Sequence, residues 1–170
     1  MTEDDDDSKN ILEQLKRARL KWNSISKILK REGANAKTMA KFYMAVVQAV
    51  LLYGAESWTI TKKNWSKLRS FHRRAMRYMA GQHIRQRKDG TWKYPDHKNL
   101  ERICGLFPIE TYIARRRGTL RKYLEENRAE LLEEAMEMTA PSKSANKILW
   151  WKQEWISKDE MTEMTNFWFK

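Results

Sequence analysis

The sequence predicts an all-α protein: a helical bundle with a small β-hairpin insertion and a C-terminal helical appendage. Two observations lead to this fold class. Apolar residues recur every three or four positions along most of the chain, which is the period of a helix buried on one face. One short stretch, residues 84–94, instead places β-prone residues on both sides of an Asp-Gly pair, which is typical of a hairpin turn.

The first two helices are predicted before residue 53. Residues 1–10 include four consecutive aspartates and are expected to form an acidic, disordered tail. Residues 11–29 then show one clean apolar stripe, and Gly33 is a typical helix stop. A second helix is expected over residues 36–52. Its stretch 44–52 is apolar on nearly all sides, so we expect it at the centre of the bundle.

The third predicted helix contains one of the groups of closely spaced arginines in the chain. Gly54 should break or bend the preceding helix, because glycine adopts backbone conformations that other residues avoid. Thr61 is a suitable N-cap, since its hydroxyl can accept a hydrogen bond from the first turn. The helix is then expected over residues 62–80, with Gly81 directly after its end.

The remaining elements of the bundle follow the predicted hairpin. Asp89-Gly90 favours a two-residue type I′ turn between its strands. A short helix is expected over residues 95–104, ended by Gly105, and a longer helix over residues 108–127 begins with a proline that suits the first helical turn. The predicted bundle therefore ends near residue 127.

The charge distribution divides the chain into three predicted parts: the acidic tail 1–10, a basic helical domain 11–127 and an acidic, Trp-rich appendage 128–170. The whole chain has a formal net charge of +12. Residues 9–123 contain 28 Lys and Arg against seven Asp and Glu, whereas residues 124–170 contain six against ten. Self-repulsion opposes the compact state of so cationic a block, and a polyanion relieves it. Nucleic acid is the favoured partner; an anionic membrane surface or an acidic protein is the alternative.

Three clusters of cations form the predicted nucleic-acid interface. Arg69, Arg73 and Arg77 are spaced by four on one face of the third helix, where no Glu lies four residues away to pair with them. We expect Trp65, Leu68, Phe71, Ala75, Tyr78 and Met79 on the buried face, with His72 between the two faces. The full set of predicted nucleic-acid-binding residues is Arg69, Arg73, Arg74, Arg77, Arg85, Arg87, Lys88, Arg115, Arg116 and Arg117.

The predicted hairpin combines cations with aromatic residues. Strand alternation places Arg85 and Arg87 on one side, and Trp92 and Tyr94 alternate in the same way on the returning strand. Such a ribbon can lie along a nucleic-acid backbone and stack unpaired bases. The other reading is that the two aromatic residues cover the core of the bundle, and for these two residues we favour core packing.

No arrangement of residues predicts catalysis, a metal or a cofactor. Ser70 and His72 are two positions apart on a helix, so their side chains diverge and cannot act as nucleophile and base. The three histidines and the single Cys104 have spacings that fit no common zinc motif. The lone cysteine favours a reducing, intracellular compartment, with nucleus or cytoplasm preferred over an organelle. No apolar run is long enough to span a membrane.

The C-terminal appendage is predicted to bind a protein. It follows a Pro-Ser-Lys-Ser break and contains several large aromatic side chains on a polar background. Such side chains need a surface on which to bury. The predicted partner-binding residues are Trp150, Trp151, Trp155 and Trp168.

Two stretches of this sequence resemble a known family. The order FYMAVVQAVLLYGAESW over residues 42–58, followed by LRSFHRR over residues 68–74, is similar to the region just after the polymerase palm of non-LTR (LINE-type) retrotransposon reverse transcriptases. The resemblance extends over about residues 11–125. It implies a helical thumb-like domain that holds a primer–template duplex by its backbone, with Arg69, Arg73 and Arg77 in that role. The palm aspartates of that family have no counterpart here.

The predicted function is therefore non-catalytic binding of nucleic acid, with RNA or RNA/DNA duplex favoured over DNA. The resemblance suggests a stand-alone, domesticated fragment of the polymerase. The alternative is a structural subunit of a large ribonucleoprotein or protein assembly, for example an organellar ribosome, that docks through its Trp-rich C-terminus. A third reading, an inert relic of a transposon, predicts no stable fold or partner.

Overall fold

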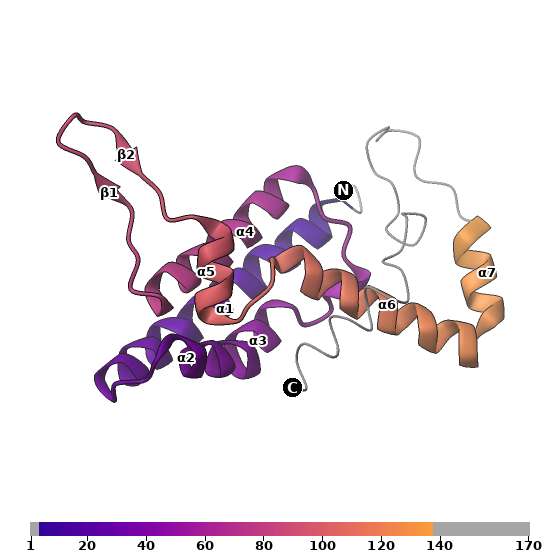
Figure 1. Cartoon of the computed structure of the whole chain (residues 1–170). Coiled ribbons are helices and arrows are strands. Elements are labelled where there is room, and N and C mark those ends of the chain that lie inside the picture. Colours follow the sequence, from indigo (N-terminus) through magenta and orange to yellow (C-terminus); the bar gives the residue numbers. More distant parts are fainter. Residues whose placement is uncertain (1–3, 138–170) are drawn as a thin grey trace. The chain divides into compact units, whose positions relative to one another are not determined.

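The computed structural model describes residues 4–137 and confirms the predicted fold class: helices with one small antiparallel hairpin (Figure 1). The described residues form two compact units. The first unit contains residues 4–53 and 60–109, and the second contains residues 54–59 and 110–137. The sequence had suggested a boundary near residue 127, whereas the contacts of the chain divide it near residue 109.

Helix α1 (Asp4–Arg31) extends further toward the N-terminus than predicted. Residues 4–10, expected in a disordered tail, belong to this helix. Acidic residues interact favourably with the positive end of a helix dipole, which is the physical reason for this correction. The predicted apolar stripe is confirmed, because Ile11, Leu15 and Ala18 are buried. Asn64 donates a hydrogen bond to Ser8 Oγ at 2.9 Å and ties the start of α1 to the third helix of the sequence prediction.

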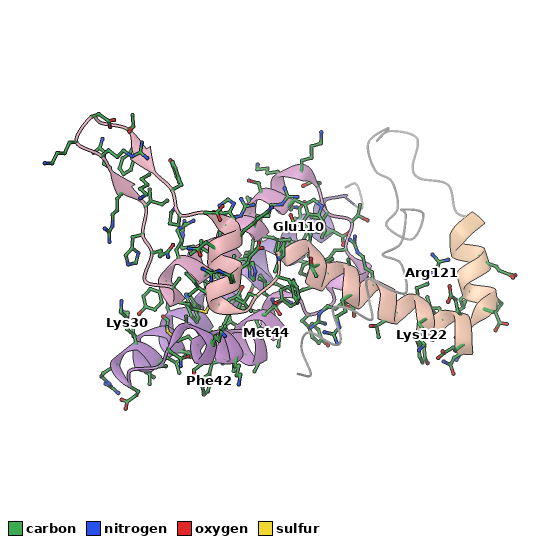
Figure 2. The ribbon with its side chains drawn as sticks, in the orientation of Figure 1. Lys30, Phe42, Met44, Glu110, Arg121 and Lys122 are labelled. Carbon is green, nitrogen blue, oxygen red and sulfur yellow. The ribbon has the colours of Figure 1, made fainter. Side chains whose placement is uncertain are left out.

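The second predicted helix is present but contains an irregular middle. It consists of α2 (Ala36–Phe42), a π-helix (Tyr43–Gln48) and α3 (Ala49–Leu51). The expectation that this segment lies at the centre of the bundle is wrong for one of its faces. Phe42 (Figure 2) is 47% exposed, and Ala45 and Ala49 are also exposed. Val47 and Leu51, in contrast, are fully buried. An apolar sequence alone does not determine which of its faces a neighbour covers.

Helix α4 (Lys62–Met79) has the predicted caps. Thr61 Oγ1 accepts a hydrogen bond from the backbone N–H of Asn64 at 3.3 Å, and Gly81 has a φ of 64° directly after the helix. The left-handed conformation ends the helix there, as the sequence predicted. Helix α5 (His97–Cys104) is capped by Asp96, whose carboxylate accepts from the backbone N–H of Asn99 at 3.0 Å.

An aromatic cluster joins α1, the π-helix and α4. Trp22 contacts the rings of Tyr43 and Tyr78 edge-on, with centroid distances of 5.5 and 5.8 Å. Tyr43 also lies 6.5 Å from the ring of Phe71. Lys30 (Figure 2) covers the outer side of Tyr78, with Nζ 4.9 Å from its ring centroid. Edge-to-face aromatic pairs contribute more to the stability of the folded state than their buried area alone accounts for. This cluster therefore holds α4 in a fixed position against α1 and the π-helix.

The hairpin consists of β1 (Arg85–Gln86) and β2 (Trp92–Lys93), and it extends away from α4 and α5 (Figure 1). Its turn differs from the predicted two-residue type I′ turn. The N–H of Gly90 donates to Arg87 O at 3.0 Å, and the N–H of Arg87 donates to Thr91 O at 2.7 Å. Gly90 has a φ of 83°, whereas no non-glycine residue in the described chain has a positive φ. A type I′ turn needs two such residues, so a three-residue loop forms instead.

The second unit is built around α6 (Ile109–Asn127), most of which it contains, and α7 (Ala129–Glu137). The predicted break at Gly54 is confirmed, since its φ of 77° ends the preceding helix and a 3₁₀ turn (Ala55–Ser57) follows. Residues 54–59 belong to this unit because they contact α6. Arg117 donates a hydrogen bond to Trp58 O at 2.7 Å, and Arg116 lies 3.9 Å from Glu56.

Candidate nucleic-acid interface

The outer face of α4 is the most cationic helical surface in the first unit. The helix contains seven Lys and Arg residues and no Asp or Glu over its 18 residues. Arg69, Arg73 and Arg77 are partly exposed and follow one another at intervals of four, as predicted, so they share one stripe of the helix surface. Trp65 begins this stripe rather than lying on the buried face. The guanidinium carbon of Arg69 lies 5.6 Å from its ring centroid, in a cation–π contact.

The arginines of α4 affect one another electrostatically. Partial burial lowers the pKa of Arg77 from its ordinary value, and the positive charges of Arg74 and Arg73 lower it further. A lowered pKa means that the surroundings disfavour the cation, so these guanidinium groups raise the free energy of one another's charged form. A bound phosphate would reverse this effect, because an opposite charge favours the cation.

His72 lies in the core and not at the edge of the cationic stripe where the sequence placed it. Its side chain is only 1% exposed. Nε2 lies 2.8 Å from Phe107 O and Nδ1 lies 2.8 Å from Tyr43 Oη. Because a carbonyl can only accept, Nε2 bears the proton and Nδ1 accepts from the tyrosine hydroxyl. His72 therefore joins α4 to two other segments and positions the helix instead of contacting a ligand.

A second cationic edge of α4 lines a groove against α1. The groove has a volume of about 410 Å³, and none of the residues that line it is acidic. Its cations are Lys16 and Arg19 of α1 with Lys67 and Arg74 of α4. The sequence predicted only Arg74 of these four. The other three were missed because the cations of α1 occupy several faces, and only the packing of α1 on α4 shows which of them meet.

The hairpin presents cations and aromatic residues to solvent. Arg85, Arg87 and Lys88 are all exposed, as a phosphate-binding role requires. Arg85 pairs with Lys93 across the strands, so these two side chains share one face. The preference for core packing of the aromatic residues is wrong, because Trp92 is 56% and Tyr94 is 65% exposed. The hairpin extends from the helices, which leaves both rings without a core to cover (Figure 1).

The third predicted cluster, Arg115 to Arg117 on α6, has a different environment. Arg117 donates to Trp58 O, and burial lowers its pKa to about 10. Arg116 has Glu56 at 3.9 Å. Further along α6, Arg121 and Lys122 (Figure 2) lie 2.7 and 3.8 Å from glutamates four residues later in the helix. Four cations of α6 therefore have partners within their own unit: Arg116, Arg117, Arg121 and Lys122.

The N-terminus of α5 lies beside the arginine stripe of α4. Burial lowers the pKa of His97, and the charges of Arg73 and Arg77 lower it further, against an opposite effect of Asp96. No role of His97 in nucleic-acid binding is predicted from the sequence. Only a structure that packs α5 on α4 brings this imidazole close to the two arginines.

The structure leaves other predictions untested. The predicted partner-binding residues Trp150, Trp151, Trp155 and Trp168 lie outside the described residues. Within residues 4–137, no three His, Cys, Asp or Glu side chains are grouped as a metal site would require. In the same part of the chain, no helix has the length and apolar character needed to cross a membrane.

Comparisons of the chain with protein-family models, with curated proteins and with solved structures found no match. The resemblance to reverse transcriptases therefore stays a prediction from the sequence. The geometry and charge of the two cationic edges of α4 and of the hairpin are the observations that bear on function.

Proposed function

We propose that this protein is a non-catalytic nucleic-acid-binding module that binds the phosphate backbone of RNA or of an RNA/DNA duplex. The observation that supports this best is the outer face of α4. Helix α4 as a whole has seven cations and no acidic residue. The groove beside it adds Lys16 and Arg19 of α1, and none of the residues that line this groove is acidic. Burial lowers the pKa of Arg77, the charges of Arg74 and Arg73 lower it further, and a bound anion would relieve this repulsion between like charges.

The support beneath α4 suits a backbone-binding role. The inner face of the helix is buried through Leu68, Phe71 and Ala75, and His72 bonds on both sides of its ring. A rigid helix holds the backbone positions of its arginines in a fixed line, so little backbone entropy is lost when phosphates bind. Phosphate contacts of this kind provide affinity and register without reading base sequence.

The resemblance to the thumb of non-LTR retrotransposon reverse transcriptases is consistent with this proposal. A thumb holds a duplex through its backbone, and the proposed module would retain that role without polymerisation. Nucleic-acid binding fits a nuclear or cytoplasmic protein, or an organellar one. We favour RNA over DNA as the ligand because the resemblance is to a polymerase that copies RNA.

The proposal is tested by measuring binding of the purified chain to double-stranded RNA, RNA/DNA hybrid, duplex DNA and single-stranded RNA. The variant replaces the stripe: Arg69→Ala, Arg73→Ala and Arg77→Ala together. Each contact between a charged group and a phosphate contributes at least about 1 kcal/mol, so the loss of three weakens binding by at least about 100-fold. The matched control replaces three cations of α6, namely Arg116, Arg121 and Lys122, with alanine.

The expected result is strong loss for the α4 variant and little loss for the α6 variant, with unchanged circular dichroism for both. Binding of wild type to none of the four ligands would overturn the proposal. Equal loss in the two variants would show that net charge, and not the α4 surface, determines binding.

A second candidate function, a structural subunit of a ribonucleoprotein assembly, is favoured by a different observation. Large apolar side chains of the first unit are exposed: Leu20 by 64%, Phe42 by 47% and Tyr53 by 73%. Leu20 and Tyr53 line one groove of about 820 Å³ between α1 and the π-helix segment. If this candidate is correct, the isolated chain should self-associate, and Leu20→Glu with Tyr53→Glu should make it monomeric. A monomeric wild-type chain would count against it.

A further inference from the structure

A pocket of about 490 Å³ lies at the base of the hairpin, where β1 and β2 meet the ends of α4 and α5. The residues of its lining that matter for ligand chemistry are Gln82, Arg85, Lys93, Tyr94, Asp96 and Asn99. Pockets of 300–1,000 Å³ accommodate ligands of the size of a nucleotide. The lining combines the ring of Tyr94 and the imidazole of His83 with two cations and several amide or carboxylate groups.

Each type of side chain in this pocket suits one part of a nucleotide. Tyr94 is 65% exposed, so the face of its ring is accessible to a base. Arg85 and Lys93 are cross-strand partners, so their charges lie on one face of the hairpin and can meet the phosphate on either side of a nucleotide. Gln82 and Asn99 provide amides that can donate to and accept from a base edge.

Several of these groups remain available for a ligand. The carboxylate of Asp96 accepts through Oδ2 from the backbone N–H of Asn99, and Asn99 Oδ1 accepts from Arg102 at 2.8 Å. These bonds fix the positions of both side chains. They leave Asp96 Oδ1 as an acceptor and the amino group of Asn99 as a donor, which is a pair that can recognise a base edge.

The pocket continues the arginine stripe of α4. Gly81, which also lines the pocket, follows the end of α4, and the backbone N–H of Gln82 donates to Arg77 O at 3.0 Å. His97, next in the chain to Asp96, is affected by the charges of Arg73 and Arg77. A backbone that follows the stripe toward the C-terminal end of α4 therefore arrives at the pocket.

From this continuity we infer that the pocket binds one unpaired nucleotide adjoining a duplex held on α4. The ligand class is thus a duplex with a single-stranded end or bulge, and the inference rests on the proposed function. The base stacks on Tyr94, its edge meets Asn99 and Asp96, and the flanking phosphates meet Arg85 and Lys93. The duplex itself contacts the stripe and does not need the pocket.

The test compares a blunt RNA duplex with the same duplex carrying a one-nucleotide 2-aminopurine overhang. Fluorescence anisotropy gives the affinities, and quenching of 2-aminopurine reports stacking of the extra base. Loss of a stacked base weakens binding about tenfold or more. We expect wild type to bind the overhang at least about tenfold tighter than the blunt duplex, and Tyr94→Ala to remove both this preference and the quenching.

The matched control is Trp92→Ala, because Trp92 is a comparably exposed aromatic residue of the same hairpin and does not line the pocket. It should keep the preference. Equal wild-type affinity for the two duplexes, or equal effects of the two variants, would overturn the inference while leaving blunt-duplex binding, and so the proposed function, intact. If wild type binds neither duplex, the inference fails, and the proposed function fails with it only when the RNA/DNA hybrid, duplex DNA and single-stranded RNA are not bound either. Unchanged thermal midpoints show that neither variant acts by unfolding.

Discussion

Helices α4 and α6 are similar in length and both rich in arginine, but their cations have different surroundings. On α6, Arg121 and Glu125 lie 2.7 Å apart, Arg116 lies near Glu56, and Arg117 bonds to Trp58 O. On α4 there is no acidic residue at all. The sequence predicted phosphate contacts for the arginines of both helices.

The comparison teaches that the number of arginines on a helix does not by itself identify a phosphate-binding surface. An exposed ion pair contributes only about 0–1 kcal/mol to stability, but it neutralises the local potential that would attract a polyanion. Cations whose neighbours are also cations instead strengthen the local potential that attracts a polyanion. The pKa of Arg77, lowered by burial and then by Arg74 and Arg73, shows that repulsion on α4. A ligand phosphate should therefore gain more on α4 than on α6.

The largest expected difference between the two helices is in the salt dependence of binding. Each phosphate neutralised on duplex DNA adds about 0.9 to the slope of log affinity against log salt. The variant Arg69→Ala, Arg73→Ala, Arg77→Ala should reduce the slope by about 2.7. This corresponds to roughly 40-fold less loss of affinity between 50 and 200 mM salt. Filter binding or anisotropy over a salt series measures the slope.

The control for this prediction is the α6 variant with Arg116, Arg121 and Lys122 replaced by alanine. Its slope should change by less than about 1, because these cations already have carboxylate partners. Equal slopes for the two variants would remove the distinction between the helices.

The next largest effect should be on stability, and it should be confined to α6. Arg117→Ala removes the donor to Trp58 O and leaves that carbonyl without this bond. A buried acceptor that loses its partner costs about 1–3 kcal/mol. Arg73→Ala, on the outer face of α4, should change the free energy of unfolding by less than about 0.5 kcal/mol. Urea titrations of the two variants check both values; a large loss with Arg73→Ala and none with Arg117→Ala would contradict the comparison.

The elements that the sequence predicted best are those fixed by local chemistry. The cap Thr61 and the stops at Gly81 and Gly105 are where they were expected, because each acts on residues within one helical turn. The buried stripe of α1 follows from its period in the same way. The spacing of the α4 arginines is also a local property, so their common face could be predicted.

What the sequence could not predict depends on contacts between distant segments. His72 is buried because Tyr43 and Phe107 meet its ring, 29 and 35 residues away. Arg117 donates to Trp58 O, 59 residues away, and Arg116 lies near Glu56 at about the same distance along the chain. No periodic pattern in the sequence predicts such long-range contacts. The same limit explains why the α1 groove and the hairpin pocket were missed: each is formed by segments that only folding brings together.

A smaller effect is expected when α4 is given the kind of acidic partner that α6 has. Ser70 is exposed and lies three and four residues before Arg73 and Arg74. Ser70→Glu should add about 0.2–0.5 kcal/mol of helix stability per ion pair. The same charge should weaken duplex binding about fivefold, or roughly 1 kcal/mol. Ser70→Gln is the control, because glutamine has nearly the same shape as glutamate without its charge. It should change neither the stability of the helix nor the affinity for duplex. Unchanged binding with Ser70→Glu would place the ligand elsewhere.

The smallest expected effect, and the most local one, is on His97. Burial, then Arg73, then Arg77 hold its pKa below the ordinary value of 6.5, although Asp96 opposes them. The folded state thus binds its proton less readily than the unfolded state, so stability is lost as the pH falls from 6.5 through the folded pKa. Arg73→Gln with Arg77→Gln should raise this pKa and reduce the loss in acid. A bound duplex should act in the same direction, because its phosphates neutralise the two arginines.

NMR titration of the His97 ring, assigned with the variant His97→Gln, measures these shifts. The α6 variant should leave the pKa of His97 where it is, since none of its three cations is among the groups that lower it. A pKa that rises with duplex in wild type, and rises less in the Arg73→Gln, Arg77→Gln protein, would mean that the phosphates act through these two arginines. If the pKa of His97 does not change when duplex is added, the ligand does not reach the end of α4 next to the hairpin pocket. The pKa of His97 thus shows whether a phosphate binds the arginine stripe of α4. Such binding would distinguish this stripe from the three replaced cations of α6, which are paired with carboxylates.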